Sequence, residues 1–112
     1  MFHEKLECYK QSVEVAEDLS KEVAKWPRGY GYLSDQLRRA ASSITLNIAE
    51  GNAKFSQPER RRFFRIARAS TAEVGACLDL MRAFALTSPI EAASLKSRLE
   101  AISKMLWGLI RR

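Results

Sequence analysis

Apolar side chains recur at intervals of three and four residues along most of this chain. The first stripe begins near Glu4 and ends at Trp26-Pro27, because the residue before a proline disfavours the α region. This spacing predicts an amphipathic helix over residues 4–25. Its expected buried face consists of Leu6, Tyr9, Val13, Ala16, Leu19, Val23 and Trp26.

A second stripe follows the loop Arg28–Gly31, whose two glycines allow a turn. It predicts a helix that begins near Leu33 or Ser34, with Ser34 or Asp35 as the N-cap or in the first turn. Gly51 is expected at C′, where a left-handed residue ends a helix. The expected buried side chains are Leu33, Leu37, Ala40, Ala41, Ile44 and Ile48.

Two capping boxes mark the starts of two further helices. Ser56-Gln57-Pro58-Glu59 opens a third helix expected to reach Leu86, and Ser88-Pro89-Ile90-Glu91 opens a fourth. The third helix is expected to bury Phe63, Ile66, Ala67, Val74, Cys77, Leu78, Met81, Phe84 and Ala85. In the fourth, a seam with heptad spacing is formed by Leu95, Leu99, Ile102, Leu106 and Leu109.

The number of elements and the length of the chain define the expected fold. No segment alternates as a strand does, and 112 residues suffice for one hydrophobic core. We therefore predict a single all-α domain over residues 1–112, an antiparallel up-down-up-down four-helix bundle. No apolar run approaches the roughly 18 residues of a membrane span, and the N-terminus is charged. A cytoplasmic protein without a membrane partner is expected.

The net charge of +6 is unevenly distributed. Residues 51–72 carry six Lys and Arg against one Asp or Glu, and residues 91–112 carry five against two. Residues 1–27 carry four against six. Such asymmetry favours an anionic partner.

A row of arginines at the start of the third helix is the strongest candidate for binding that partner. Arg61, Arg65 and Arg68 stand at i, i+4 and i+7 and should share one helix face. Lys54 precedes them, and Phe55 is placed to stack on a base. Together with Lys54, the three arginines are our predicted nucleic-acid-binding residues. The alternative is a solvated face, or salt bridges to acidic residues of the first helix, namely Glu14, Glu17 and Asp18.

The segment Gln36–Gly51 combines small residues with internal polar ones. Dense small residues allow close helix approach, here of the second helix on the third. A structural polar network that fixes register is expected among Arg38 or Arg39, Asn47 and Glu50.

Residues that could support catalysis are sparse. His3 is the only histidine, no Gly-rich phosphate loop precedes a helix, and Cys8 and Cys77 lack metal-site spacing. We therefore expect no catalytic residue, no metal, no cofactor and no enzymatic activity. The cysteines are expected to pack as small hydrophobic residues. Exposed aromatic surface is expected at Phe2, Trp26 and Trp107.

Several of these motifs together resemble one family, the four-helix-bundle proteins encoded in 23S ribosomal RNA intervening sequences. The resemblance covers roughly residues 2–110. It is carried by Trp26-Pro27, Tyr32-Leu33, Gln36-Leu37-Arg38-Arg39-Ala40-Ala41-x-Ser43-Ile44, Asn47-Ile48-Ala49-Glu50-Gly51 and Phe64-x-Ile66-Ala67-Arg68-Ala69-Ser70-x-x-Glu73. The chain departs from the pattern at Ala69, where the family usually has glycine.

The resemblance implies assembly more than activity. Family members form ring-like homopentamers, and a related branch works beside the reverse transcriptase of diversity-generating retroelements and binds nucleic acid. We therefore expect a non-enzymatic, ring-forming homopentameric scaffold that binds RNA or DNA, RNA first, through its arginine face. A reverse transcriptase or another protein is a further expected partner. The alternative is a protein–protein adaptor whose contacts are Trp26 and Trp107 and whose basic face only keeps it in solution.

Overall fold

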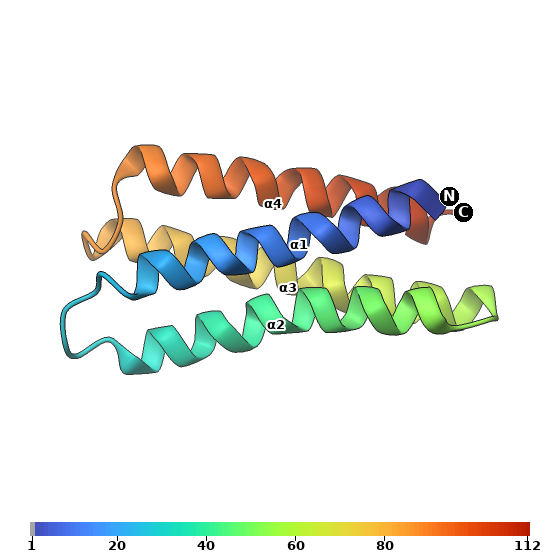
Figure 1. Ribbon diagram of the computed structural model, residues 1–112, viewed down its shortest axis with the longest axis horizontal. Coiled ribbons are helices and arrows are strands. Elements are labelled where there is room, and N and C mark those ends of the chain that lie inside the picture. Colours follow the sequence, from blue (N-terminus) through green and yellow to red (C-terminus); the bar gives the residue numbers. More distant parts are fainter. Residues whose placement is uncertain (1) are drawn as a thin grey trace.

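The computed structural model describes residues 2–112, with side chains from His3 onward. Its described part consists of four helices: α1 (Phe2–Val23), α2 (Gly31–Ala53), α3 (Gln57–Ala83) and α4 (Pro89–Ile110). Each helix runs antiparallel to the one before it, and α1 closes the bundle by packing on α4 (Figure 1). The all-α up-down-up-down bundle predicted from the sequence is confirmed.

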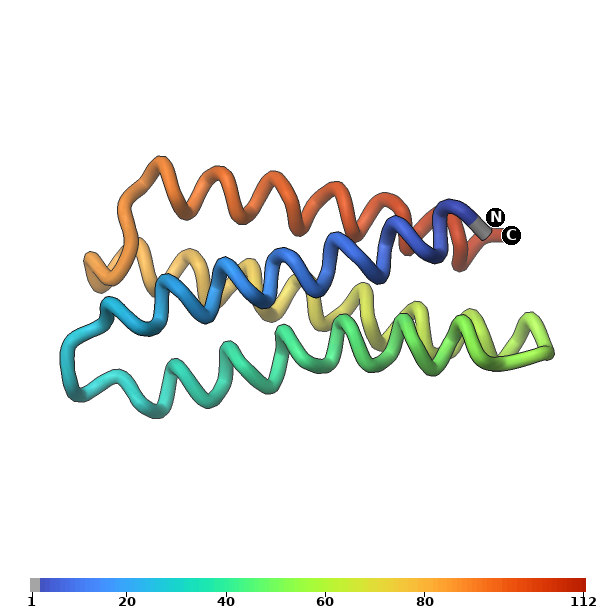
Figure 2. The backbone as a smooth tube through the Cα atoms, viewed as in Figure 1, coloured from blue at the N-terminus to red at the C-terminus, as the bar shows by residue number. Residues whose placement is uncertain are grey.

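The bundle is a rod 45 Å long and 23 by 18 Å across. Both chain termini and the turn between α2 and α3 lie at one end (Figure 1). The α1–α2 and α3–α4 turns lie at the other end, as the backbone trace also shows (Figure 2). Residues from the start of α3 and the end of α4 are therefore brought to the same end.

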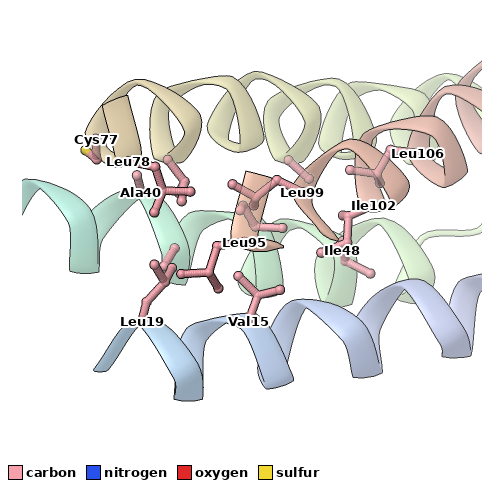
Figure 3. Packing of buried hydrophobic residues seen from close by; sticks show 14 of the residues in the cluster. Val15, Leu19, Ala40, Ile48, Cys77, Leu78, Leu95, Leu99, Ile102 and Leu106 are labelled. Atoms are coloured by element: carbon pink, nitrogen blue, oxygen red, sulfur yellow. The ribbon is translucent and has the colours of Figure 1, made fainter. Parts of the chain in front are cut away.

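The core is one cluster to which all four helices contribute. The predicted α4 seam is confirmed, because its five aliphatic residues are all buried. Leu95, Leu99, Ile102 and Leu106 point inward towards Val15, Ile48 and Leu78 of the other helices (Figure 3). The six predicted core residues of α2 are buried as well.

Local capping chemistry is also as predicted at the starts of α3 and α4. The Ser56 hydroxyl accepts the backbone N–H of Glu59 at 3.3 Å. The Ser88 hydroxyl accepts that of Glu91 at 3.1 Å. Each serine satisfies a helix N–H that has no carbonyl partner within the first turn.

The predicted inward face of α1 is wrong in its first half and confirmed in its second. Leu6, Tyr9 and Val13 are exposed. Leu19 is buried, and the other members of the predicted stripe are partly buried against the core, namely Ala16, Val23 and Trp26. The buried face is offset by about one residue towards the N-terminus and consists of Cys8, Ser12, Val15, Leu19 and Glu22, of which Ser12 and Glu22 are polar. These polar groups have partners on distant segments, since Ser12 bonds Thr45 and Glu22 bonds Thr87. Apolar periodicity alone could not identify them.

Both predicted ends of α2 are also corrected. The helix begins at Gly31 after Tyr30, so Ser34 lies inside the first turn and is not the N-cap. Gly51 lies within the helix rather than in a left-handed C′ position. Its lack of a side chain lets α2 approach Phe64 of α3 closely, because a Cβ added at Gly51 would lie 2.5 Å from Cε1 of Phe64.

On α3, the buried aromatic residue is Phe64 rather than Phe63, which is only partly buried. Ile66, Phe84 and Ala85 are exposed, contrary to prediction. Phe84 and Ala85 lie beyond the helix end at Ala83, where the chain turns through Ala85 with a φ of 58°. The remaining predicted core residues of α3 are buried, namely Ala67, Val74, Cys77, Leu78 and Met81.

None of the helices in the described part of the chain combines the length and the apolar character of a membrane span.

Candidate nucleic-acid interface

The charges divide the bundle into two halves when each helix is cut at its midpoint. The half that contains the termini and the α2–α3 turn comprises residues 2–12, 43–70 and 100–112. It carries eleven Lys and Arg against five Asp and Glu, a net of +6. We call it the basic half. The neutral half, residues 13–42 and 71–99, carries eight of each, so the whole net charge of the chain lies in the basic half.

The predicted arginine row lies in the basic half, on the side of α3 that faces α4. Arg61 Nη1 donates to the backbone oxygen of Arg112 at 3.1 Å. Arg68 Nε donates to Ser103 Oγ at 3.2 Å, and its guanidinium carbon lies 5.0 Å from the ring centre of Trp107. The three arginines therefore share one side of α3, and Arg61 and Arg68 are held by Arg112, just beyond the end of α4, and by Ser103 of α4.

Arg65 lies between these two arginines on the same row. It is exposed, and it has no ion-pair or hydrogen-bond partner among the residues whose side chains are described. It lines a groove of about 710 Å³ between α3 and α4, together with Arg68 and Trp107. Its charge is the one in this row most available to a ligand.

Lys54 is set apart from the row, at the C-cap of α2. Its Nζ lies 3.6 Å from Glu50 and 5.3 Å from the ring centre of Phe63. Its backbone oxygen accepts Arg60 Nε at 2.6 Å, which holds the turn against the start of α3. Lys54 therefore belongs to the same end of the bundle, although it does not lie on the α4-facing side.

The expected alternative, salt bridges between these arginines and α1, is not found among the described residues. Helices α1 and α3 lie diagonally across the bundle and do not pack on each other. Asp18 of α1 instead bonds Arg98 of α4 at 2.6 Å. The arginine row thus remains without carboxylate partners from α1.

The four side chains of the expected polar network are not brought together. Arg39 bonds Gln36, and Glu50 pairs with Lys54. Asn47 donates to the backbone oxygen of Ser43 and to its hydroxyl, within its own helix. Arg38 is exposed.

A smaller hydroxyl link joins α2 to α3 instead. Ser70 Oγ donates to Ser43 Oγ at 2.8 Å across the interface. Short side chains at both positions permit this close approach, as the density of small residues predicted. The Asn47 segment is therefore a packing element and presents no polar site.

Two of the three predicted exposed aromatic residues can be assessed, since the side chain of Phe2 lies outside the described part. Trp107 is 47% exposed, as predicted. Trp26 is only partly buried and packs against the core, so its prediction as an exposed contact is wrong. Its ring meets Tyr30 edge-on at 6.5 Å. In the basic half, Phe55 is 96% exposed beside Lys54.

The two thiols behave as structural groups. Burial raises the pKa of Cys8 to about 12. Burial, and then the nearby charge of Glu73, raise the pKa of Cys77. Both remain protonated at neutral pH, which makes them poor nucleophiles and poor metal ligands. Within the described residues, no cluster of His, Cys, Asp or Glu is arranged to hold a metal ion.

Sequence reasoning did not identify the α4 side of this interface. Ser103 and Arg112 hold two arginines of the row, yet neither stands in a motif. The only available signal was Trp107, a large aromatic residue off the apolar seam.

The comparisons with known proteins agree with this architecture. Residues 4–108 match the sequence model of the family described as 23S rRNA-intervening sequence protein. No curated protein matches the chain. A solved structure with the same fold is that of a protein with unknown function from the S23 ribosomal protein family from Bacteroides thetaiotaomicron. It is 20% identical, with a TM-score of 0.85 over 97% of this chain and 99% of that one. The bundle, its NIAEG element and the family match over nearly its full length together make this chain a member of the 23S rRNA-intervening sequence protein family.

Proposed function

We propose that this protein is a non-enzymatic, oligomeric scaffold that binds nucleic acid, and RNA in particular, through its basic half. The observation that carries the proposal is the concentration of the entire net charge of +6 in that half. Phosphate backbones attract such a surface, and each phosphate contact releases bound counterions.

The geometry of the arginine row supports phosphate contact. Among the described residues, Arg61 and Arg68 each donate one hydrogen bond, to Arg112 and Ser103, and Arg65 donates none. Each keeps N–H donors for a ligand, because a guanidinium has five. Because the guanidinium groups of Arg61 and Arg68 are already held by hydrogen bonds, less conformational entropy is lost when they bind a phosphate.

Self-assembly into a ring, homopentameric by family resemblance, is the second part of the proposal. The outward face of α1 presents Leu6, Tyr9 and Val13 at helical spacing, all exposed. Apolar side chains gathered on one helix face are typical of a surface that another chain covers. Five copies would present five basic halves to one RNA, and the affinity would rise through multivalency.

The alternative is a protein–protein adaptor whose basic half only favours solubility. The same outward stripe on α1 supports it, together with exposed Trp107. Under this alternative, a protein partner would bind equally well when Arg61, Arg65 and Arg68 are neutralised together.

The test is binding of structured RNA over a salt series, combined with light scattering. If Lys54, Arg61, Arg65 and Arg68 each contact one phosphate, log Kobs should fall with log[salt] with a slope of roughly −3 per chain. Light scattering should report five times the chain mass of 12.7 kDa. No binding at low salt, or a slope near zero, would overturn the nucleic-acid proposal, and a monomer at micromolar concentration would overturn the assembly.

A further inference from the structure

The groove between α3 and α4 has two chemically different ends. In the basic half it is bordered by Arg65, Arg68 and Trp107. In the neutral half it is bordered by Asp79 and Lys96, which pair at 2.8 Å. Its volume of about 710 Å³ lies in the range of sites that enclose small organic groups.

Trp107 is placed in this groove in an unusual way. The residue remains 47% exposed, although burial of an aromatic side chain favours folding. Arg68 lies over the ring, and the hydrogen bond from Arg68 to Ser103 fixes that guanidinium. Part of the indole is therefore covered by a fixed guanidinium, and its exposed remainder borders the same groove as Arg65, in the half of the molecule that carries the net charge.

We infer that Trp107 is a stacking platform for an unpaired base, so that single-stranded RNA gains a contact on the basic half that an RNA duplex, held through its phosphates alone, does not make. The inference rests on the proposed function and names its ligand class. Bases in a duplex are stacked on one another and are not free to enter a groove between two helices. A base of a single strand can lie on the indole, while its phosphates reach Arg65 and Arg61.

The same groove restricts the path of the strand. Asp79 and Glu100 border it beyond the arginine pair. Their carboxylates repel phosphates, and among the described residues Asp79 pairs with Lys96, whereas Glu100 forms no ion pair. The strand therefore enters from the basic end and does not follow the groove into the neutral half.

Trp107 can be observed alone because the chain has only one other tryptophan. Trp26 lies in the neutral half, and its buried Nε1 has no hydrogen-bond partner among the described residues. Trp26→Phe therefore costs no hydrogen bond and leaves Trp107 as the single indole. In this background, oligoadenylate should quench the fluorescence, whereas inorganic polyphosphate, which has no bases, should bind without quenching.

The affinity test uses Trp107→Ala and the matched control Ile90→Ala. Ile90 is an exposed apolar residue of the same helix, in the neutral half. Trp107→Ala should weaken oligoadenylate binding between about 5- and 150-fold, as expected for one lost base–aromatic stack. It should leave binding of an RNA duplex unchanged, and Ile90→Ala should change neither. Circular dichroism checks that each variant is folded, and Trp107→Phe, which keeps a ring, should retain most of the affinity.

The outcomes separate the inference from the proposed function. Equal loss of oligoadenylate and duplex binding in Trp107→Ala, or no loss of either, would overturn the stacking inference while nucleic-acid binding stands. Failure of every RNA to bind at low salt would overturn the proposed function itself, and the inference with it.

Discussion

The two halves of this bundle are built from the same four helices, yet they use their charges differently. In the neutral half, carboxylates and cations pair across helices, as in Asp18 with Arg98 and Asp79 with Lys96. In the basic half, Arg112 pairs with Glu4 in the same way, but eleven cations face only five carboxylates, and Arg65 has no partner within the described residues. The comparison shows that the surplus positive charge lies in the basic half, whereas the net charge of +6 alone does not say where it lies.

The aromatic residues of the two halves also differ in how much they contact one another. In the neutral half, the ring centre of Tyr30 lies 6.5 Å from that of Trp26 and 6.0 Å from that of Phe84, so these rings contact one another even though Phe84 remains exposed. In the basic half, Phe55 and Trp107 are exposed beside cations. The neutral half balances its charges and joins its aromatic rings to one another, whereas the basic half carries the surplus charge and two exposed rings beside cations, which is the surface that we propose for RNA.

The largest expected effect on stability compares one glycine from each half. Gly51→Ala, in the basic half, would place a Cβ 2.5 Å from the buried Phe64 ring and should destabilise by about 1–3 kcal/mol. Gly75→Ala, in the neutral half, meets no atom within 4 Å and should stabilise by about 0.5–1 kcal/mol through helix propensity. Urea unfolding of both variants measures the two effects. If the two glycine variants shift stability in the same direction, the close-approach role of Gly51 is wrong.

A smaller effect is expected at the end of α3, in the neutral half. Ala85 adopts a φ of 58°, and Leu86 N–H bonds the backbone oxygen of Met81 at 2.7 Å, which closes the helix. An L-residue is strained there and glycine is not. Ala85→Gly should therefore raise the free energy of unfolding by about 0.5–1 kcal/mol. Ala83→Gly, still inside the helix, should lower it and serves as the control.

The smallest effect concerns a carboxylate of the basic half. The hydrogen bond from Arg112 holds the pKa of Glu4 below its usual value of 4.5. Because the folded-state pKa is lowered, this contribution to stability is present above pH 4.5 and is lost as the pH falls through the folded value. NMR titration should show the Glu4 pKa rising in Arg112→Gln. An unchanged Glu4 pKa in that variant would contradict the assigned cause.

Local chemistry made much of the fold predictable. Ser56 and Ser88 cap within three residues of themselves, so a short motif suffices to place them. The α4 seam is apolar at every inward position, and its periodicity is unambiguous. On α1 two stripes interleave, and the buried one includes Ser12 and Glu22. Their partners lie 33 and 65 residues away, so no local pattern could favour that stripe.

In the candidate site, too, local spacing was predictable, whereas contacts between helices were not. The spacing of Arg61, Arg65 and Arg68 placed them on one face, and they share it. Which helix that face meets depends on the packing of α3 on α4, and so Ser103 was not predictable. The network expected around Asn47 failed because Asn47 finds its acceptors one helical turn away, on Ser43.

The most direct test of the central claim compares charge removal in the two halves. One variant combines Arg61→Gln, Arg65→Gln and Arg68→Gln in the basic half. Its control combines Arg28→Gln, Arg38→Gln and Arg39→Gln, which removes the same charge from exposed positions of the neutral half.

Binding of RNA to both variants is measured over the same salt series. Loss of three charge-assisted contacts should weaken binding by the basic-half variant roughly 100-fold and flatten its salt slope by roughly 2. The control should remain within a few-fold of the unmodified protein. Equal losses in the two variants would mean that net charge alone attracts RNA, and would contradict a binding surface in the basic half.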